Sequence, residues 1–424
     1  MMHHLTPRLL LSSLFAATLI ACTGTAGAVV PDIVQAAVPA PKEPVRPSAP
    51  THVALHSAIQ TILDRAVADS AFPGAIAVIG TRSGPLVSVT AGHIDWAPSP
   101  APDARTLWDL ASLTKVVGMT SAMMQLVERG TVSLDAPVQR YLPEWTGPFK
   151  ERVTVRHLIT HQSGLPAFKQ YFKLNVSPDS IRQLFFQTPL DTLPGTRMVY
   201  SDIGAILLGQ IIERVSGEPL DVYLARHVVE PLGMVDTRYR PAAALLPRIA
   251  PTERDPWRGR HLRGEVHDEN AAALGGISAH AGLFSTAHDL DRFARAYLNG
   301  GVLDGARLAS AATIGAFTTV ADSTFSSRAL GWDTPAANSS GGHFIRRPAF
   351  GHTGYTGTSL WIAPQHDLYV MLLTNRVNPT REHSRIAPVR VAVADAAMRA
   401  LVPATVQAIE ATAAKASTPS PSRP

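Results

Sequence analysis

Residues 108–119 of the chain read WDLASLTKVVGM. They place Lys115 inside an apolar helical pattern that continues to residue 128, although lysine is scarce in a chain that carries its positive charge mostly as arginine. Ser112 lies one helical turn before Lys115, so on a helix the two side chains project from the same face. Apolar burial is expected to lower the pKa of the lysine, which would let its amine accept the serine proton. The pattern therefore indicates a serine nucleophile, beside a helix N-terminus that favours a developing oxyanion.

A structural interpretation of the same residues is also open. Ser112 would cap the helix, and Lys115 would extend its charge to the surface. Ser-x-x-Lys is expected by chance about once or twice in a chain of this length. Among the lysines of this chain, only Lys115 has a serine three positions earlier. The motif alone is consistent with both a catalytic and a structural role. Residues elsewhere in the chain are needed to distinguish the two roles.

Length and composition indicate a globular enzyme. The 424 residues suffice for one large domain or two closely packed ones, and 46% hydrophobic against 17% charged residues excludes wholesale disorder. The net charge of +5 is modest, and no basic run is interleaved with aromatic residues. Nucleic acid is therefore excluded as an expected partner.

The first 22 residues predict export. Basic residues precede an apolar run in residues 1–21, which is typical of a signal peptide and too short to span a membrane comfortably. The run ends in LIAC, and Cys22 is the only cysteine. This tetrapeptide resembles the bacterial lipobox, which implies a lipid anchor on Cys22 at a membrane surface facing the periplasm or exterior. Simple cleavage after the Ala-Gly-Ala of residues 26–28 is the alternative.

The rest of the chain predicts one α+β domain over residues 52–401, between a disordered tether (22–51) and a disordered tail (402–424). A helix is expected at 52–70 and another at 385–400. Strands are expected early and late in this domain, at 74–80, 85–91, 329–333, 348–353, 358–363 and 368–374. A mostly helical block of roughly residues 120–300 separates them. This order indicates one sheet built from both ends of the domain.

Tyr200 and Asp202 open an apolar helix expected at 203–215. A phenol at the mouth of a helix can pass a proton between a serine oxygen and a leaving amine. Tyr200 would otherwise only cover the core, with Asp202 as an acidic residue at the helix start.

A third segment, His352-Thr353-Gly354-Tyr355, ends one late strand. Its glycine lets a substrate backbone lie beside the strand edge, and the Tyr355 N–H would be a second oxyanion donor.

Together the three segments resemble the signature of class C β-lactamases, D-Ala-D-Ala carboxypeptidases and related esterases: Ser-x-x-Lys, Tyr-x-Asn and Lys-Thr-Gly. The likeness includes the blocks 130–138 and 153–166. It implies a sheet of about five antiparallel strands flanked by helices, with the site in a cleft beside a helical insertion. It also implies that Ser112 is acylated, that Lys115 and Tyr200 move protons, and that the N–H groups of Ser112 and Tyr355 form the oxyanion hole.

Two departures from the signature affect substrate binding. Asp202 replaces an amide with an acceptor that would repel a substrate carboxylate. His352 replaces a fixed cation with a group expected to titrate near neutrality. Both changes argue against efficient β-lactam hydrolysis. Arg346 or Arg347 would restore a cation, or else form a solvated strand end.

The block of residues 264–287 is similar to members acting on cell-wall fragments, DD-carboxypeptidases and N-acetylmuramyl-L-alanine amidases. His267, Asp268 and His280 are expected near the cleft and hydrogen-bonded. They lack the spacing of metal ligands, and a Ser/Lys/Tyr site needs no metal or other cofactor.

These observations predict an exported serine hydrolase that cleaves amide or ester bonds in peptides or muropeptides derived from peptidoglycan. The expected substrate contacts are Asp202, His352, Thr353, Gly354 and Tyr355. A β-lactamase, a carboxylesterase and a non-catalytic binder of cell-wall peptide or β-lactam remain alternatives. The sequence does not predict the oligomeric state.

Overall fold

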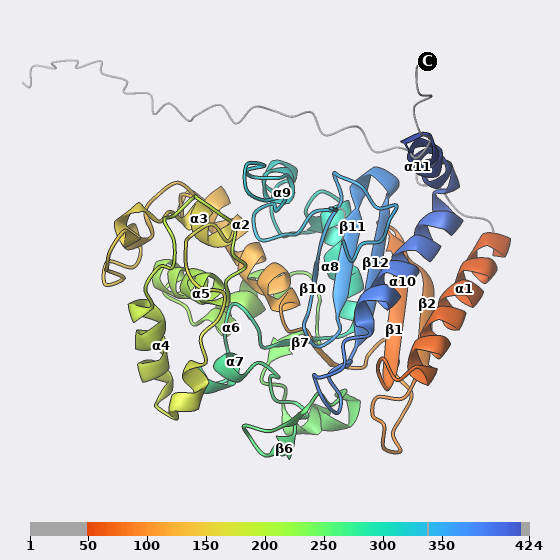
Figure 1. Cartoon of the computed structure of the whole chain (residues 1–424), viewed down its shortest axis with the longest axis horizontal. Coiled ribbons are helices and arrows are strands. Elements are labelled where there is room, and N and C mark those ends of the chain that lie inside the picture. Colours follow the sequence, from red (N-terminus) through yellow and green to blue (C-terminus); the bar gives the residue numbers. More distant parts are fainter. Residues whose placement is uncertain (1–48, 337–338, 417–424) are drawn as a thin grey trace, which may run out of the picture. The chain divides into compact units, whose positions relative to one another are not determined.

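A five-stranded antiparallel sheet forms the centre of the computed structural model, which describes residues 49–336 and 339–416 (Figure 1). The strand order is β10-β11-β12-β1-β2, so the late strands join the early ones. Their bounds are β1 (Gly74–Thr81), β2 (Gly84–Gly92), β10 (Phe350–Thr353), β11 (Ser359–Ala363) and β12 (Leu368–Thr374). This arrangement confirms the predicted α+β fold and a sheet built from both ends of the domain.

The central strand β1 divides the core into two clusters. All its residues are buried, and their side chains alternate between the two faces of the sheet. Ile76 and Val78 join a large cluster shared with the helical region. Ala75, Ala77 and Ile79 join the second cluster, which α1 and α10 cover. A strand buried on both faces reads as a continuous apolar run, as this one does.

Helices α1 (Ala49–Ala68) and α10 (Ile386–Leu401) pack side by side on one face of the sheet (Figure 1). A further helix, α11 (Pro403–Ala416), follows α10, and the prediction of disorder from residue 402 is therefore wrong for residues 403–416. Val406 is buried in the second cluster, and Arg399 pairs with Glu410 at 2.8 Å. This packing and an alanine-rich composition stabilise a segment whose pattern alone is weak.

The opposite face carries α8 (Ala287–Leu298) and leads to the predicted helical region. Its other helices are α2 (Ser121–Glu128), α3 (Val155–Ile159), α4 (Pro178–Gln187), α5 (Asp202–Ser216), α6 (Leu220–Leu224), α7 (Glu269–Ala273) and, after α8, α9 (Ala311–Thr318). The described residues also include two π-helical turns, Lys115–Thr120 and Ala225–Val229. Their 3-10 turns are Val138–Arg140, Lys150–Arg152, Tyr171–Leu174, Ala243–Arg248 and Pro364–His366.

Small sheets join this region to the centre. A three-stranded sheet has the order β3 (Trp108–Asp109), β7 (Leu283–Ser285), β4 (Arg238–Tyr239). Two hairpins pair β5 (Arg254–Asp255) with β6 (Arg260–His261) and β8 (Val302–Leu303) with β9 (Ala306–Arg307). The first sheet matters for function because β3 leads directly into the Ser112 segment.

One predicted strand, residues 329–333, does not form. Only Asp333 makes an isolated bridge, to Gly351. Gly331 has a positive φ of 80°, and a Cβ there would meet the Thr120 hydroxyl at 2.1 Å. The chain therefore turns against the π-helical turn Lys115–Thr120 instead of extending along the sheet.

The predicted signal peptide, Cys22 and most of the tether lie outside the described residues. No helix in residues 49–336 or 339–416 is both long enough and apolar enough to cross a membrane.

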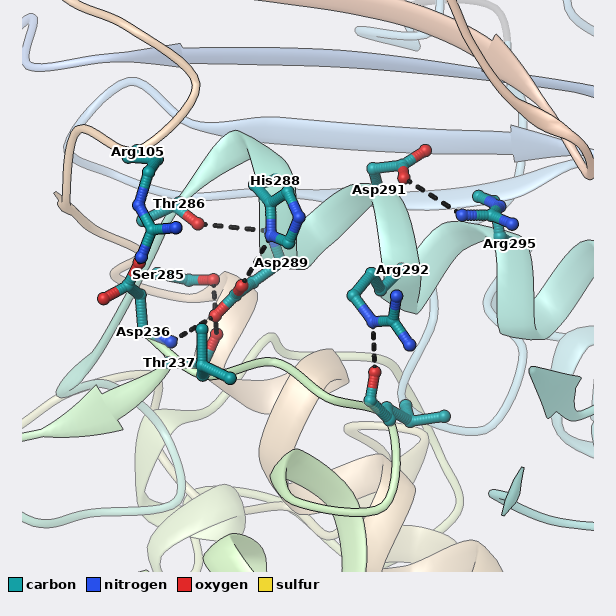
Figure 2. A network of polar contacts seen from close by, with 12 residues as sticks. Arg105, Asp236, Thr237, Ser285, Thr286, His288, Asp289, Asp291, Arg292 and Arg295 are labelled. Carbon is teal, nitrogen blue, oxygen red and sulfur yellow. Dashed lines mark hydrogen bonds and ion pairs between the residues drawn. The ribbon is translucent and has the colours of Figure 1, made fainter. Parts of the chain in front are cut away.

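Asp289 at the start of α8 fastens this helix to the segment before β4 (Figure 2). Its carboxylate is fully buried and accepts hydrogen bonds from the Asp236 N–H at 2.8 Å and the Thr237 hydroxyl at 2.9 Å. Thr286 caps the helix by accepting from the Asp289 N–H at 3.1 Å. These bonds join α8, which packs on the central sheet, to the segment that leads into β4 of the three-stranded sheet.

Replacement Asp289→Ala would leave the buried Asp236 N–H without its acceptor and leave the Thr237 hydroxyl only the Ser285 hydroxyl at 2.7 Å, and we expect it to lower the free energy of unfolding by about 2–4 kcal/mol. Urea denaturation followed by circular dichroism measures this change. The matched control is Asp135→Ala, because the Asp135 side chain is 74% exposed and pairs with Arg156 at the surface. We expect the control to cost less than about 1 kcal/mol. Equal midpoints for the two variants would contradict the proposed role of Asp289.

Candidate active site

Ser112 lies in a turn directly before the helix that carries Lys115. The preceding Ala111 has a positive φ of 45°, and its N–H donates to the buried carboxylate of Asp109 at 2.8 Å. The same carboxylate accepts from the His267 N–H at 2.6 Å, and burial raises its pKa. Because the turn is held from both sides, the half-buried Ser112 hydroxyl has a defined position beside the helix N-terminus.

The amino group of Lys115 lies among three oxygen acceptors. Nζ is 3.0 Å from the Ser112 hydroxyl, 2.9 Å from the His280 carbonyl and 2.7 Å from the Asp202 carboxylate. The side chain is only 1% exposed. An ammonium group has three N–H donors, so these three acceptors match the protonated lysine.

The expectation of a lowered lysine pKa is therefore wrong. Burial disfavours the ammonium form, but the Asp202 charge, with a contribution from Tyr200, more than offsets it and raises the pKa of Lys115 above its usual value. The sequence predicted Asp202 as a substrate contact, whereas the structure pairs its carboxylate with Lys115. This pairing makes Asp202 part of the proton-handling group around Ser112.

Tyr200 lies next to Lys115, and its ring centroid is 5.0 Å from Nζ. Its hydroxyl is buried and has no hydrogen-bond partner among the described residues. His161 supports the segment, because its ring lies tilted with its centroid 4.5 Å from that of Tyr200 and its Nδ1 accepts the Ser201 N–H at 3.1 Å. Burial, with the nearby charges of Arg328 and Lys115, lowers the pKa of His161 well below its usual value, so it remains a neutral acceptor.

His352 does not titrate near neutrality as predicted. It is buried and lies 5.9 Å from Tyr200 between ring centroids. Burial, followed by the charges of Arg328 and Lys115, lowers its pKa well below the usual value. Nδ1 donates to the Thr353 carbonyl at 2.8 Å, and Nε2 is buried without a partner in the described part of the chain. His352 therefore offers a neutral acceptor where the family signature has a cation.

The turn after β10 meets the Ser112 segment directly. Thr356 donates to the Asp109 carbonyl at 2.7 Å and Thr358 donates to the Leu110 carbonyl at 3.0 Å. A Cβ on Gly354 would meet the Thr358 hydroxyl at 2.1 Å and the Leu110 carbonyl at 2.3 Å. This close contact brings the backbone of Thr353, Gly354 and Tyr355 beside Ser112.

The predicted oxyanion donors are available. Within the described residues, the N–H groups of Ser112 and Tyr355 make no hydrogen bond to protein. Behind the turn, Arg390 donates to the carbonyls of Gly354 at 2.8 Å and Thr358 at 2.7 Å, and burial lowers its pKa to about 10. The assignments of nucleophile, proton carriers and oxyanion donors stay predictions that this geometry permits.

The histidines of residues 264–287 are hydrogen-bonded, as expected. His280 joins the Ser278 hydroxyl at 2.7 Å to Asp268 at 2.8 Å, and this contact lowers the pKa of Asp268. His267 lies 2.9 Å from Glu253, whose pKa falls to about 2 because the contacts with His267 and Arg381 outweigh burial. No group of ionisable side chains in residues 49–336 or 339–416 has the arrangement of a metal site.

Sequence reasoning missed Arg328. Its guanidinium is buried and lies 5.2 Å from the centre of the Tyr200 ring, with only a loose ion pair to Asp333 at 3.8 Å. Arg346 and Arg347, considered as the replacement cation, are exposed, and the Arg346 carbonyl binds Gln365 at the other end of the β10–β11 pair. The buried cation near Tyr200 therefore comes from a segment without a motif.

Comparison with known proteins identifies the family. The family model described as "Beta-lactamase" matches residues 59–395, most of the chain. The chain belongs to the β-lactamase family. It is therefore a serine hydrolase of the β-lactamase and penicillin-binding-protein group.

This β-lactamase-family hydrolase has several named relatives. It is 34% identical over 358 residues to the N-acetylmuramyl-L-alanine amidase of Bacillus subtilis (strain 168), covering 75% of this chain and 80% of the relative. It is 32% identical over 315 residues to a putative D-alanyl-D-alanine carboxypeptidase of Salmonella agona (strain SL483), covering 67% and 72%. A penicillin-binding protein homologue from Caulobacter crescentus shares the fold, with a TM-score of 0.68 at 23% identity over 82% of this chain and 98% of that one.

Replacement Gly354→Ala tests the contact between the β10–β11 turn and the Ser112 segment. The added Cβ must displace the turn, so we expect kcat for a p-nitrophenyl ester to fall about 10-fold or more. The control is Gly315→Ala, because a Cβ there meets no atom within 4 Å. Circular dichroism of both variants checks the fold. Wild-type kcat in a folded Gly354→Ala protein would show that the turn does not position the reacting groups.

Replacement Asp202→Asn tests the charge state of Lys115. Removing the carboxylate leaves burial as the main influence and lowers the lysine pKa. If catalysis requires loss of the lysine proton, the rise of kcat/KM with pH must move to lower pH in the variant. Ester hydrolysis measured between pH 6 and 10 gives the two profiles. If the rise of kcat/KM occurs at the same pH in both proteins, the protonation of Lys115 does not control activity.

Proposed function

We propose that the chain is an exported serine hydrolase that forms an acyl-enzyme on Ser112 and cleaves an amide or ester bond in peptidoglycan-derived peptides. The observation that carries this proposal is the contact of Ser112 with Lys115 beside Tyr200 and the Tyr355 turn. A cell-wall substrate of the DD-carboxypeptidase or muramyl-peptide amidase type is supported by the names of the two sequence relatives. The export signal and lipid anchor expected in residues 1–22 would place the enzyme where such substrates occur.

The distances support a relay for the serine proton. As Ser112 attacks the substrate carbonyl, its proton passes over 3.0 Å to Lys115, which passes one of its own protons over 2.7 Å to Asp202. The N–H groups of Ser112 and Tyr355 stabilise the oxyanion. The stored proton returns through Lys115 and the Tyr200 hydroxyl to the leaving amine. Water then attacks the acyl-enzyme by the reverse route.

The neutral His352 and the carboxylate of Asp202 distinguish this site from one built to hold β-lactams. Neither residue offers the cation or the amide that the family signature provides at these positions. We therefore infer that cell-wall peptides are better substrates than β-lactams.

Incubation with a muropeptide mixture, followed by mass spectrometry, tests the function. Loss of terminal D-Ala identifies a carboxypeptidase, and separation of the peptide from the lactyl group identifies an amidase. Ser112→Ala is the control, and we expect it to lose turnover by at least about 10³-fold. Nitrocefin or p-nitrophenyl acetate turnover without any change in the muropeptides would instead identify a β-lactamase or a carboxylesterase.

A fluorophosphonate probe separates an enzyme from a non-catalytic binder. We expect intact-mass analysis to show one covalent adduct on the wild-type protein and none on Ser112→Ala. An unlabelled wild-type protein that still binds cell-wall peptide would contradict the acyl-enzyme proposal.

A further inference from the structure

A hollow lies beyond the Tyr355 turn, at the same end of the central sheet. Its volume is about 280 Å³, and it is lined by Ser70, Trp96, Arg376, Asn378, Pro379, Thr380 and His383. Arg376 is the second residue after β12, and β12 and β11 are paired so that Leu372 faces Ser359 beside the turn. The hollow therefore continues the edge of the sheet on which the predicted oxyanion donor lies.

Trp96 presents an apolar face to this hollow. The residue is 44% exposed, which is high for the largest side chain in proteins. Its indole N–H already donates to the Asn378 carbonyl at 2.8 Å. The ring is thus held in place by its polar edge, and its face remains free for a flat apolar surface.

Two polar residues next to this face are buried, and one of them has an oxygen without a partner among the described residues. Asn378 is 3% exposed, and its Oδ1 has no hydrogen-bond partner among the described residues. Arg376 is 7% exposed and bonds only carbonyl oxygens, of Tyr355 at 2.7 Å and of Arg381 and His383 at 3.4 Å. No carboxylate in the described part of the chain pairs with Arg376. A buried acceptor such as the Asn378 Oδ1 requires a partner, which a hydroxyl group of a polar ligand would supply.

Arg376 also connects the hollow with the candidate active site. Its guanidinium lies 4.2 Å from the centre of the Tyr355 ring, and it holds the Tyr355 carbonyl. His267 stacks near the same ring at 5.8 Å, yet Tyr355 remains 51% exposed. A substrate whose carbonyl lies at the Tyr355 N–H can therefore extend over an exposed phenol ring toward Trp96.

We propose that this hollow is a sugar subsite that takes a pyranose ring from the glycan part of a muropeptide. A pyranose has an apolar C–H face that packs on Trp96 and a rim of hydroxyl and acetamido groups that bond Arg376 and Asn378. An aromatic peptide side chain would use the indole face but leave the Asn378 oxygen without a partner. The inference rests on the proposed function, and it assigns recognition of the sugar as well as the peptide to this enzyme.

Binding to the full chain in its Ser112→Ala form tests the subsite without turnover. The probe is the disaccharide of N-acetylglucosamine and N-acetylmuramic acid, and the readout is tryptophan fluorescence. We expect a saturable change that is lost with both Trp96→Ala and Trp96→Phe. Isothermal titration calorimetry, which does not depend on the indole, should give a Kd about 3- to 10-fold higher for Trp96→Phe than for the Trp96 protein. The matched control is Phe149→Ala, an aromatic residue 50% exposed in the helical region, which should leave the change intact.

Kinetics provide the second test. For wild type we expect a higher kcat/KM with a disaccharide-linked stem peptide than with the same peptide lacking sugar. Trp96→Ala should reduce this preference about 3- to 10-fold, mainly through KM. Equal loss on both substrates, or a stem peptide that perturbs Trp96 as strongly as the disaccharide, would overturn the proposal.

The two proposals fail in different ways. If wild type turns over no muropeptide, the proposed function fails, while disaccharide binding to the Ser112→Ala protein still decides the subsite. If muropeptides are cleaved but the disaccharide leaves the fluorescence unchanged, the subsite is wrong and the hydrolase stands.

Discussion

The ammonium group of Lys115 is the centre on which the rest of the site depends. Three segments far apart in the sequence each supply one oxygen to it: the turn at Ser112, the loop at His280 and the start of α5 at Asp202. A buried charge without such partners would cost several kcal/mol, so the three acceptors stabilise both the lysine and the approach of their segments. The turn after β10 then joins the first of these segments to the central sheet, because Thr356 and Thr358 bond the carbonyls just before Ser112.

Two cations and two neutral imidazoles surround the Tyr200 ring. Lys115 and Arg328 lie near the ring, while His161 and His352 contact it as neutral imidazoles. The two cations account in part for this neutrality, because each disfavours a further positive charge nearby. Asp202 is the carboxylate paired directly with Lys115. Asp and Asn side chains have nearly the same shape, so the presence of Asp where the family signature has Asn mainly affects the protonation of Lys115.

The sequence allowed the main contact to be predicted because it depends on local geometry. Ser112 and Lys115 are three positions apart at the start of a helix, so their side chains meet whatever the rest of the fold does. The direction of the lysine pKa was mispredicted because it depends on where Asp202 points, and this is a tertiary contact. The same reason applies to His352, whose burial beside Arg328 has no signal in its own motif.

Elements with strong periodicity were predicted to within a few residues. The strand at 368–374 and the helix at 385–400 agree with β12 and α10 almost residue for residue. The missing strand at 329–333 and the unexpected α11 show the limit of such patterns. Both depend on packing against distant segments, through Gly331 on Thr120 and Val406 in the second core cluster.

The left-handed backbone at Ala111 has a consequence for protein engineering. A residue with a Cβ in this conformation carries a cost of about 1–3 kcal/mol that the surrounding contacts must offset. Glycine at this position would relieve that cost and increase thermal stability, yet it would also widen the set of conformations open to the neighbouring hydroxyl. At position 111, a substitution that increases thermal stability would therefore lower activity.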